Sequence, residues 1–193
     1  MIQIVQQLDS RVLKTKQKLF DAYLSMLEQQ APEKMTIQTL TTTANINRVT
    51  FYKHYQNVAQ FHEEFIAHYI LELYEFMKPL NYKTYTKGFE YEALLQLLKH
   101  IQTNRKTYRI LLASPNISDF NKALLAHFQE RIEKHTTELA KFDFPGTGVN
   151  QTIVAWYGVS ALFGTVIMWA QSDFKYSPEQ LANAMVRLAP HAD

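Results

Sequence analysis

Residues 36–55 read TIQTLTTTANINRVTFYKHY, and this stretch decides the fold that the sequence predicts. Its apolar spacing indicates two helices of about seven residues each, joined by Ala44-Asn45-Ile46, which are the dimensions of a helix-turn-helix. Asn45 stands where the turn needs a left-handed backbone, which Asn tolerates better than any residue except Gly. Asn47 is placed to cap the second helix. The facing sides are predicted to hold Ile37, Leu40 and Ala44 from the first helix and Ile46, Thr50, Phe51 and Tyr55 from the second.

That packing leaves Arg48, Val49, Tyr52 and Lys53 pointing outward from the second helix. A helix in this position enters the major groove of DNA with its N-terminus first. Arg48 could then donate two hydrogen bonds to a guanine, and Lys53 could reach a base edge or a phosphate. Tyr52 and His54 offer donors of suitable length for phosphates. A surface hairpin with an ordinary solvated face has the same pattern, so these residues alone leave both interpretations open.

Outward from this stretch, the apolar spacing is helical along nearly the whole chain. A first helix is expected from about Ser10 to Gln30, with Asp9 or Ser10 as its cap. A longer helix is expected to begin at Asn57. We therefore predict an all-α fold of about nine helices without strands. The apolar face of the first helix is predicted to include Leu13, Phe20, Tyr23, Leu24 and Leu27.

The second half of the chain also has clear helix boundaries. Asn81–Gly88 and Phe144–Gly148 are expected to interrupt the helices because they contain turn-forming residues. The last helix is expected to start at Ser177, with Pro178 in its first position and Gln180 in its first turn.

Composition narrows the class of protein. Cysteine is absent, so disulfides are excluded. Hydrophobic residues make up 47% of the chain, which is enough to form a globular core. Residues 1–60 contain seven Lys or Arg and four Asp or Glu, whereas the remainder contains 13 and 14. A basic first third suits a polyanionic partner. Met1–Ser10 has no secretory pattern, so a soluble cytoplasmic protein is expected.

The stretch from Thr152 to Ala170 contains no charged residue and has the length of a membrane-spanning helix. It also contains polar residues and glycines and lacks basic flanks on either side. We favour a helix buried in a soluble core or a dimer interface over one that spans a membrane.

The run from Asn47 to Tyr55 resembles the signature of TetR-family transcriptional regulators, in which Thr-Phe/Leu-Tyr-x-His-Phe/Tyr closes the recognition helix. The likeness extends to Thr36-Ile37 and to Thr15–Phe20, covers residues 9–75 well, and continues by architecture alone. The opening Ser177–Gln180 resembles members from low-GC Gram-positive bacteria. The resemblance implies a DNA-binding domain over residues 1–56 and a ligand-binding and dimerisation domain over residues 57–193.

The same resemblance assigns roles within the helix-turn-helix. Base edges would be contacted by Arg48, Val49 and Lys53, with Gln38 from the preceding helix. Phosphates would be bound by Thr36, Tyr52 and His54, and the DNA-binding set as a whole also includes Asn47 and Thr50.

Three residues depart from the family pattern. The turn glycine is Asn45, a small alanine of the first helix is Thr41, and a phosphate-binding lysine is Val58. Thr41 is expected to loosen or shift the contact between helices. Val58 removes a phosphate contact, although the amides of that helix start could still receive a phosphate. DNA affinity is therefore expected to be modest.

We find no constellation for catalysis, no metal-ligand spacing and no cofactor motif, so an enzyme is not expected. The histidines are interpreted as solvated or core residues. Aromatic residues of the second half could line an apolar effector pocket or simply form the core, and the pocket candidates are Tyr108, Phe128 and Trp156. Small residues would allow two copies of the uncharged helix to approach closely in a homodimer: Ala155, Gly158, Ala161 and Gly164.

The sequence thus predicts a homodimeric regulator that binds a two-fold double-stranded DNA operator. A repressor released by a small apolar or amphipathic effector is the expectation. One alternative is an activator that responds to a protein co-regulator, and another is a helical interaction or membrane-associated module with vestigial DNA binding.

Overall fold

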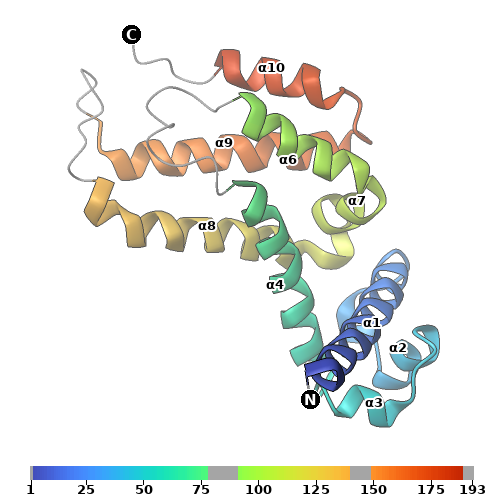
Figure 1. The fold of residues 1–193 in the computed structure, drawn as a ribbon. Helices are drawn as coiled ribbons and strands as arrows, with labels where there is room; N and C mark the ends of the chain where they lie inside the picture. The colour runs from blue at the N-terminus through green and yellow to red at the C-terminus, as the bar shows by residue number, and fades with distance from the viewer. Residues whose placement is uncertain (1, 78–90, 140–148, 189–193) are drawn as a thin grey trace. The chain divides into compact units, whose positions relative to one another are not determined.

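The computed structural model describes residues 2–77, 91–139 and 149–188. Within these ranges the chain forms nine α-helices and two short 3-10 helices, and no strand, which confirms the predicted all-α fold (Figure 1). The interruptions expected at Asn81–Gly88 and Phe144–Gly148 lie outside the described residues. The chain divides into two compact units, Met1–His68 with Ser114–Ile117, and Tyr69–Ala113 with Ser118–Asp193.

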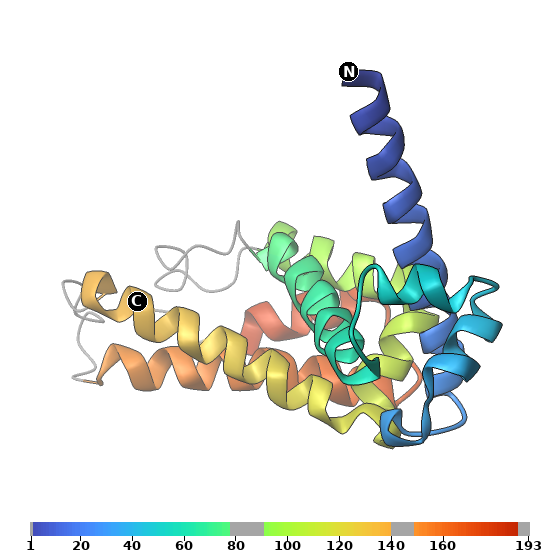
Figure 2. The ribbon, with the colours of Figure 1, turned by 90° about the horizontal axis from the view of Figure 1, so that it is seen from below.

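The first unit is built on helix α1 (Ile2–Leu27), which is longer than predicted. The expected start near Ser10, capped by Asp9 or Ser10, was wrong, because residues 2–9 contain no Gly or Pro to stop the helix and continue it toward the N-terminus. The predicted core residue Leu13 was also wrong, since its side chain is 62% exposed. Among the side chains of α1 that the structure describes, which start at Ser10, the first buried one is Leu19. The first turns of the helix extend beyond α2 and α3 (Figure 2).

The first unit contains three further short elements before α4 (Val58–Met77), and one short 3-10 turn from a distant part of the chain. They are the 3-10 turn η1 (Pro32–Lys34), α2 (Ile37–Thr43), α3 (Arg48–Tyr52) and the 3-10 turn η2 (Pro115–Ile117), and the unit also holds the first part of α4. Helix α2 packs on both α1 and α3.

Aromatic rings from α1, α3 and α4 form the centre of this unit. Phe61 lies with its ring centroid 5.1 Å from that of Tyr23 and 5.0 Å from that of Tyr55, both nearly edge-to-face. Phe65 makes similar contacts with Tyr23 at 4.9 Å and with Phe20 at 5.3 Å. Edge-to-face rings contribute about 0.5–1.5 kcal/mol per pair beyond the burial of their area. This cluster therefore fixes α3 against the two longer helices.

The second unit contains the rest of α4 with α6 (Tyr91–Thr103), α7 (Arg105–Ala113), α8 (Ser118–Leu139), α9 (Gln151–Gln171) and α10 (Pro178–Leu188). Helices α8 and α9 run side by side, α7 packs on both, and α10 packs on α6 (Figures 1 and 2). No helix of the described ranges is both long and apolar enough to cross a membrane, α9 included.

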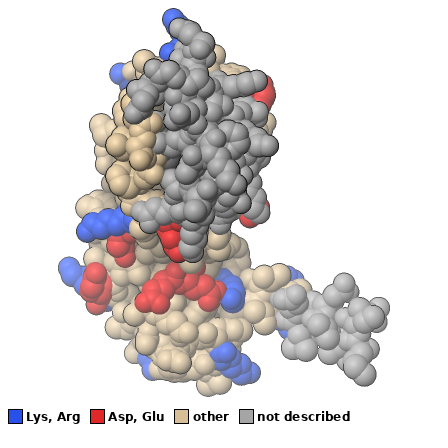
Figure 3. All heavy atoms as spheres, turned by 90° about the vertical axis from the view of Figure 1, so that its left-hand side faces the viewer, with Lys and Arg blue, Asp and Glu red and all other residues tan. Residues whose placement is uncertain are grey.

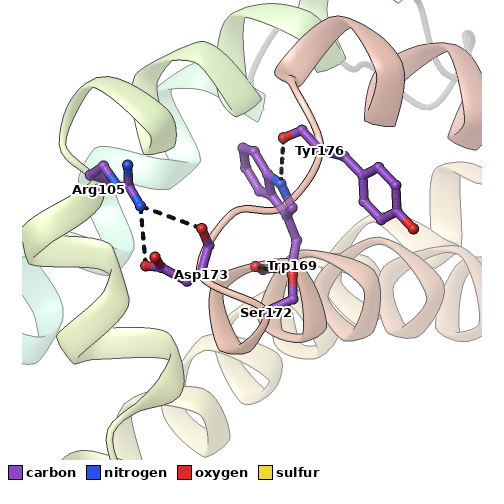
Figure 4. Close-up of polar contacts among 5 residues, drawn as sticks. All are labelled: Arg105, Trp169, Ser172, Asp173 and Tyr176. Atoms are coloured by element: carbon purple, nitrogen blue, oxygen red, sulfur yellow. Dashed lines mark hydrogen bonds and ion pairs between the residues drawn. The ribbon is translucent and has the colours of Figure 1, made fainter.

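The turn between α9 and α10 is held by several polar contacts (Figure 4). Arg105 donates to the backbone oxygen and the carboxylate of Asp173 at 3.3 and 3.1 Å, and its guanidinium lies 5.5 Å from the ring centroid of Phe174. Asp173 and Phe174 have positive φ angles of 54° and 58°, which residues other than Gly rarely adopt. The indole of Trp169 donates to the backbone oxygen of Tyr176 at 2.9 Å. These contacts offset the backbone strain and tie α9 to the start of α7.

The predicted start of the last helix is confirmed. The hydroxyl of Ser177 accepts a hydrogen bond from the backbone N–H of Gln180 at 3.2 Å, and the side chain of Gln180 accepts one from the N–H of Ser177 at 2.9 Å. Two first-turn donors are satisfied by this reciprocal pair, with Pro178 in the first helical position.

Candidate nucleic-acid interface

Helix α2 is defined by its N-terminal cap. The Thr36 hydroxyl accepts a hydrogen bond from the Thr39 N–H at 3.1 Å, and the Thr39 hydroxyl accepts one from the Thr36 N–H at the same distance. The two hydroxyl oxygens also lie 3.1 Å apart, and because the Thr39 hydroxyl donates to the Thr36 carbonyl at 3.0 Å, the Thr36 hydroxyl can donate to the Thr39 oxygen. An exposed threonine of this kind at a helix start suits a phosphate oxygen.

The turn between α2 and α3 has the geometry that the sequence predicts. Asn45 has a φ of 50°, in the left-handed region. The Asn47 side chain accepts a hydrogen bond from the Val49 N–H at 2.8 Å and so caps α3. Asn47 therefore fixes where α3 begins, and its place in the DNA-binding set stays a prediction.

Burial separates the residues of α3 into an inner and an outer face. Phe51 is fully buried and Tyr55, just beyond the helix, nearly so, while Thr50 and His54 are half-buried. The outer face holds Arg48 and Lys53, both exposed, with Val49 at 63% and Tyr52 at 59% exposure, and Gln38 on α2 is exposed as well. The structure thus leaves outside every residue that the sequence predicted to contact base edges.

The helix-turn-helix is free of acidic residues. No Asp or Glu occurs between Glu33 and Glu63, a segment that contains Lys34, Arg48 and Lys53. In the view of Figure 3, which faces the left-hand side of Figure 1, basic side chains lie at the lower edge and acidic side chains gather above them. A surface with cations and no carboxylates attracts a polyanion without local repulsion.

Three residues support α3 from behind, and sequence reasoning missed their connection. Glu64 on α4 accepts a hydrogen bond from the Tyr55 hydroxyl at 3.1 Å and pairs with Lys16 on α1 at 2.6 Å. Burial and the neighbouring Glu64 raise the pKa of Tyr55 well above its usual value. The tyrosine therefore stays neutral and keeps donating to the carboxylate. Nothing local in the sequence marks this contact, because Lys16 and Glu64 are 48 positions apart.

The structure shows the surroundings of two of the three residues that depart from the family pattern, Thr41 and Val58. The buried Thr41 hydroxyl donates to the Ile37 carbonyl of its own helix at 2.7 Å, so it needs no partner across the α2–α3 contact. At the start of α4, Asn57 accepts from the N–H of Gln60 at 2.8 Å, and the Gln60 side chain accepts from the N–H of Gln56 at 2.7 Å. Val58 is half-buried there and offers no charge.

In the second unit the three pocket candidates lie in different surroundings. Tyr108 is fully buried and its hydroxyl lies 3.0 Å from Nε2 of His100, which is itself 3.1 Å from the Glu72 carboxylate. Burial, and to a smaller extent the charge of Glu72, raise the pKa of Tyr108 far above its usual value. His100 also stacks on Phe76 with a centroid distance of 4.2 Å. No short sequence pattern connects these four residues, which come from α4, α6 and α7.

Phe128 belongs to a separate aromatic group between α4, α8 and α9. Its ring centroid is 4.7 Å from that of Phe163 and 6.2 Å from that of Tyr74. Tyr74 also lies 5.9 Å from His127, with the rings nearly perpendicular. Trp156 on α9 is 44% exposed. The effector pocket assigned to Tyr108, Phe128 and Trp156 stays a prediction.

One face of α9 presents apolar and small residues to the outside. Ile153, Tyr157 and Met168 are each more than half exposed. Between them Ala161 and Gly164 are exposed and Gly158 is half-buried, while the side chain of Ala155 is outside the described set. A Cβ added to Gly164 would meet nothing within 4 Å. These positions recur every three or four residues, so they form one stripe along the helix.

No group of three or more histidine, aspartate or glutamate side chains in the described residues could hold a metal ion. His62 hydrogen-bonds through Nδ1 to the Tyr23 hydroxyl at 2.7 Å. This contact joins α4 to α1 inside the first unit.

The comparisons with known proteins agree with this architecture. The family model of the TetR transcriptional regulator C-terminal region matches residues 90–191. Curated protein sequences give no significant match.

Three solved structures share the fold. A TetR transcriptional regulator from Streptococcus agalactiae 2603V has a TM-score of 0.64 at 21% identity and covers 97% of this chain and 99% of its own. NalD, the secondary repressor of the MexAB-OprM multidrug efflux pump in Pseudomonas aeruginosa, scores 0.62 at 17% identity, covering 91% and 94%. The dihydroxyacetone kinase operon activator DhaS scores 0.58 at 19% identity, covering 91% and 93%.

Proposed function

Because the chain belongs to the TetR family of transcriptional regulators, we propose that it is a sequence-specific repressor that binds a two-fold operator as a homodimer in the cytoplasm. The observation that carries this proposal is the outer face of α3. Arg48, Val49, Tyr52 and Lys53 are exposed on it, and no carboxylate lies between Glu33 and Glu63. Capping and a buried Phe51 fix the orientation of that face before DNA arrives.

Within this interface we divide the work between bases and phosphates. Arg48, Val49, Lys53 and Gln38 contact base edges in the major groove. Thr36, Tyr52 and His54 contact phosphates, and Thr36 is exposed at the start of α2. The dipole and amides of the α4 start offer a weaker substitute for the charge that Val58 lacks.

The stripe on α9 supplies the dimer contact in this proposal. Ile153, Tyr157 and Met168 flank small residues at Ala161 and Gly164, so two copies of α9 can approach closely. Burying this stripe removes exposed apolar surface from water at about 25 cal/mol per Å². The dimer would place two α3 helices about 34 Å apart, on successive major grooves.

Regulation follows from binding to one conformation only. An effector that prefers the conformation with wrongly spaced α3 helices lowers DNA affinity by that preference, and DNA weakens the effector equally. The aromatic group of Tyr74, Phe128 and Phe163 favours a small apolar or amphipathic effector.

Activation is the second candidate function, and two observations favour it. DhaS, which shares the fold, is described as an operon activator. Trp156 is 44% exposed on α9 and would suit a protein co-regulator. Transcription in vitro from a promoter that carries the operator separates the two: a repressor lowers transcript yield as protein is added, and an activator raises it.

The primary test uses fluorescence anisotropy to measure how tightly the purified protein binds the DNA upstream of its own gene, across a series of salt concentrations. We expect the affinity to exceed that for random DNA by roughly a thousandfold and to fall steeply with salt. Affinity no better than for random duplexes, on this DNA and on a pool of random sequences, would refute sequence-specific binding.

A further inference from the structure

The outer face of α3 contains one side chain that cannot form a hydrogen bond. Val49 is 63% exposed, yet it lies one residue from Arg48 and four from Lys53, in the middle of the acid-free surface. The helix does not need it for packing, because Phe51 fills the core instead. A β-branched residue also has a lower helix propensity than Ala, so local helix stability gives no reason for it.

In the major groove thymine is the one standard base that presents a methyl group. Thymine has a C5 methyl, whereas the other base edges present hydrogen-bond donors and acceptors at the positions a protein reads. A valine against those polar atoms would remove them from water without replacing their hydrogen bonds, which is unfavourable. Against a thymine methyl, the same side chain buries apolar surface on both partners.

We propose that Val49 reads the C5 methyl group of a thymine in each operator half-site. This inference rests on the proposed function and adds a base identity to it. Arg48 and Lys53 offer hydrogen-bond donors for guanine and for phosphate. Val49 is therefore the residue of this face that selects for the methyl group of a thymine in the half-site. The operator therefore contains, within the few base pairs under α3, at least one thymine that cannot be replaced without loss.

The test uses deoxyuridine, which pairs like thymidine and lacks only the methyl group. An operator is first selected from random duplexes with the full-length protein. Each thymine is then replaced by deoxyuridine at equivalent places in both half-sites, and Kd is measured by anisotropy. One position should weaken binding about fourfold per half-site and about fifteenfold for both, from the burial of one methyl group at each.

Val49→Ser should bind the thymine operator more weakly and lose the difference between thymine and deoxyuridine at that position. Leu13→Ala is the matched control, because Leu13 is an aliphatic side chain of the same unit with 62% exposure. This control should retain the full difference. Circular dichroism should show that both variants keep the helical content of the parent protein.

Three outcomes would count against the inference in different ways. Selection of a defined operator that is indifferent to deoxyuridine at every position would overturn it and leave the proposed function intact. A sensitivity that survives in Val49→Ser would assign the methyl contact to another side chain, such as Tyr52. Failure to select any sequence would refute the proposed function and this inference with it.

Discussion

Each of the two units contains a buried tyrosine in a polar network with a glutamate of α4, but the order of the contacts differs. In the first unit Tyr55 donates to Glu64, and Lys16 pairs with the same carboxylate. In the second unit His100 lies between the tyrosine and the glutamate, and it contacts both Tyr108 and Glu72.

The two units also expose opposite kinds of surface. In the first, the side chains left outside α3 are mainly cationic or polar and belong to a short, well-capped helix. In the second, the face left outside α9 is apolar, and ion pairs such as Arg105–Asp173 lie on other elements. One unit therefore has a capped, charged outer face suited to DNA, while the other presents on α9 a face suited to another helix.

The largest expected effect comes from removing the residue that anchors α3. Phe51→Ala should lower the free energy of unfolding by about 3–5 kcal/mol, because Phe51 is fully buried among aromatic rings. Tyr52→Ala, at the next position and 59% exposed, should cost less than about 1 kcal/mol. Urea unfolding measures both, and hydrogen exchange should place the loss of protection in the first unit. If both variants lost the same amount of unfolding free energy, the assignment of Phe51 to the inner face of α3 and of Tyr52 to the outer face would be wrong.

The outer face can be tested without disturbing stability. Arg48→Ala should reduce affinity for the selected operator by about 1–3 kcal/mol and relax the preference at one base pair. His54→Ala should weaken all sequences alike, since it is assigned to a phosphate. Anisotropy with a panel of single-base operator variants measures both. If each substitution causes the same sequence-independent loss, the division between base and phosphate contacts is wrong.

Removing the two tyrosine hydroxyls separately sharpens the comparison of the units. Tyr108→Phe should cost about 1–2 kcal/mol, because Tyr108 is fully buried and its hydroxyl contacts His100, which also pairs with Glu72. Tyr55→Phe should cost about 0.5–1 kcal/mol, because it loses one contact, and Glu64 keeps Lys16. The midpoints of urea unfolding at pH 7 give the order. A larger loss for Tyr55→Phe would mean that the partly exposed network of the first unit is the stronger one.

Alkaline pH tests the same tyrosines through their ionisation. Burial and a nearby glutamate raise the pKa of both Tyr55 and Tyr108 above that of an unfolded tyrosine, so the folded state favours the neutral form. Their contribution to stability is complete below about pH 10 and falls as pH rises further, by at most about 1.4 kcal/mol per pH unit for each tyrosine. Unfolding free energies measured from pH 8 to 11 should decline less steeply in each Phe variant than in the parent. An identical decline in all three proteins would mean that neither pKa is raised.

What the sequence could predict depends on how local the cause is. Asn45, Asn47 and Ser177 act on backbone groups within three residues of themselves, and the structure places all three as predicted. The start of α1 was missed because a plausible cap at Ser10 says nothing about whether the residues before it can continue the helix. Leu13 fitted the helical spacing but precedes the part of α1 that is packed.

The polar contacts of both units depend on residues far apart in the chain. Lys16 with Glu64, and Glu72 with His100, meet only because α4 packs against other helices. No spacing rule connects them, and hydrogen bonds of this kind follow from the fold instead of specifying it. The outer face of α3 was predictable for the opposite reason, since its composition and its periodicity lie within one turn-helix segment.

The smallest expected effect concerns Thr41, which the sequence suggested would loosen the contact between α2 and α3. The hydroxyl donates to carbonyls of its own helix, Ile37 at 2.7 Å and Gln38 at 3.3 Å, so Thr41→Ala leaves no donor or acceptor of another element unpaired. The variant loses the burial of one methyl group, about 0.8 kcal/mol, and gains about as much from the better helix propensity of Ala. Unfolding midpoints and operator affinity should therefore both stay close to those of the parent protein. A loss above about 2 kcal/mol would show that Thr41 packs in a way Ala cannot replace, and a gain in affinity without a change in stability would show that it shifts α3 away from its best position on DNA.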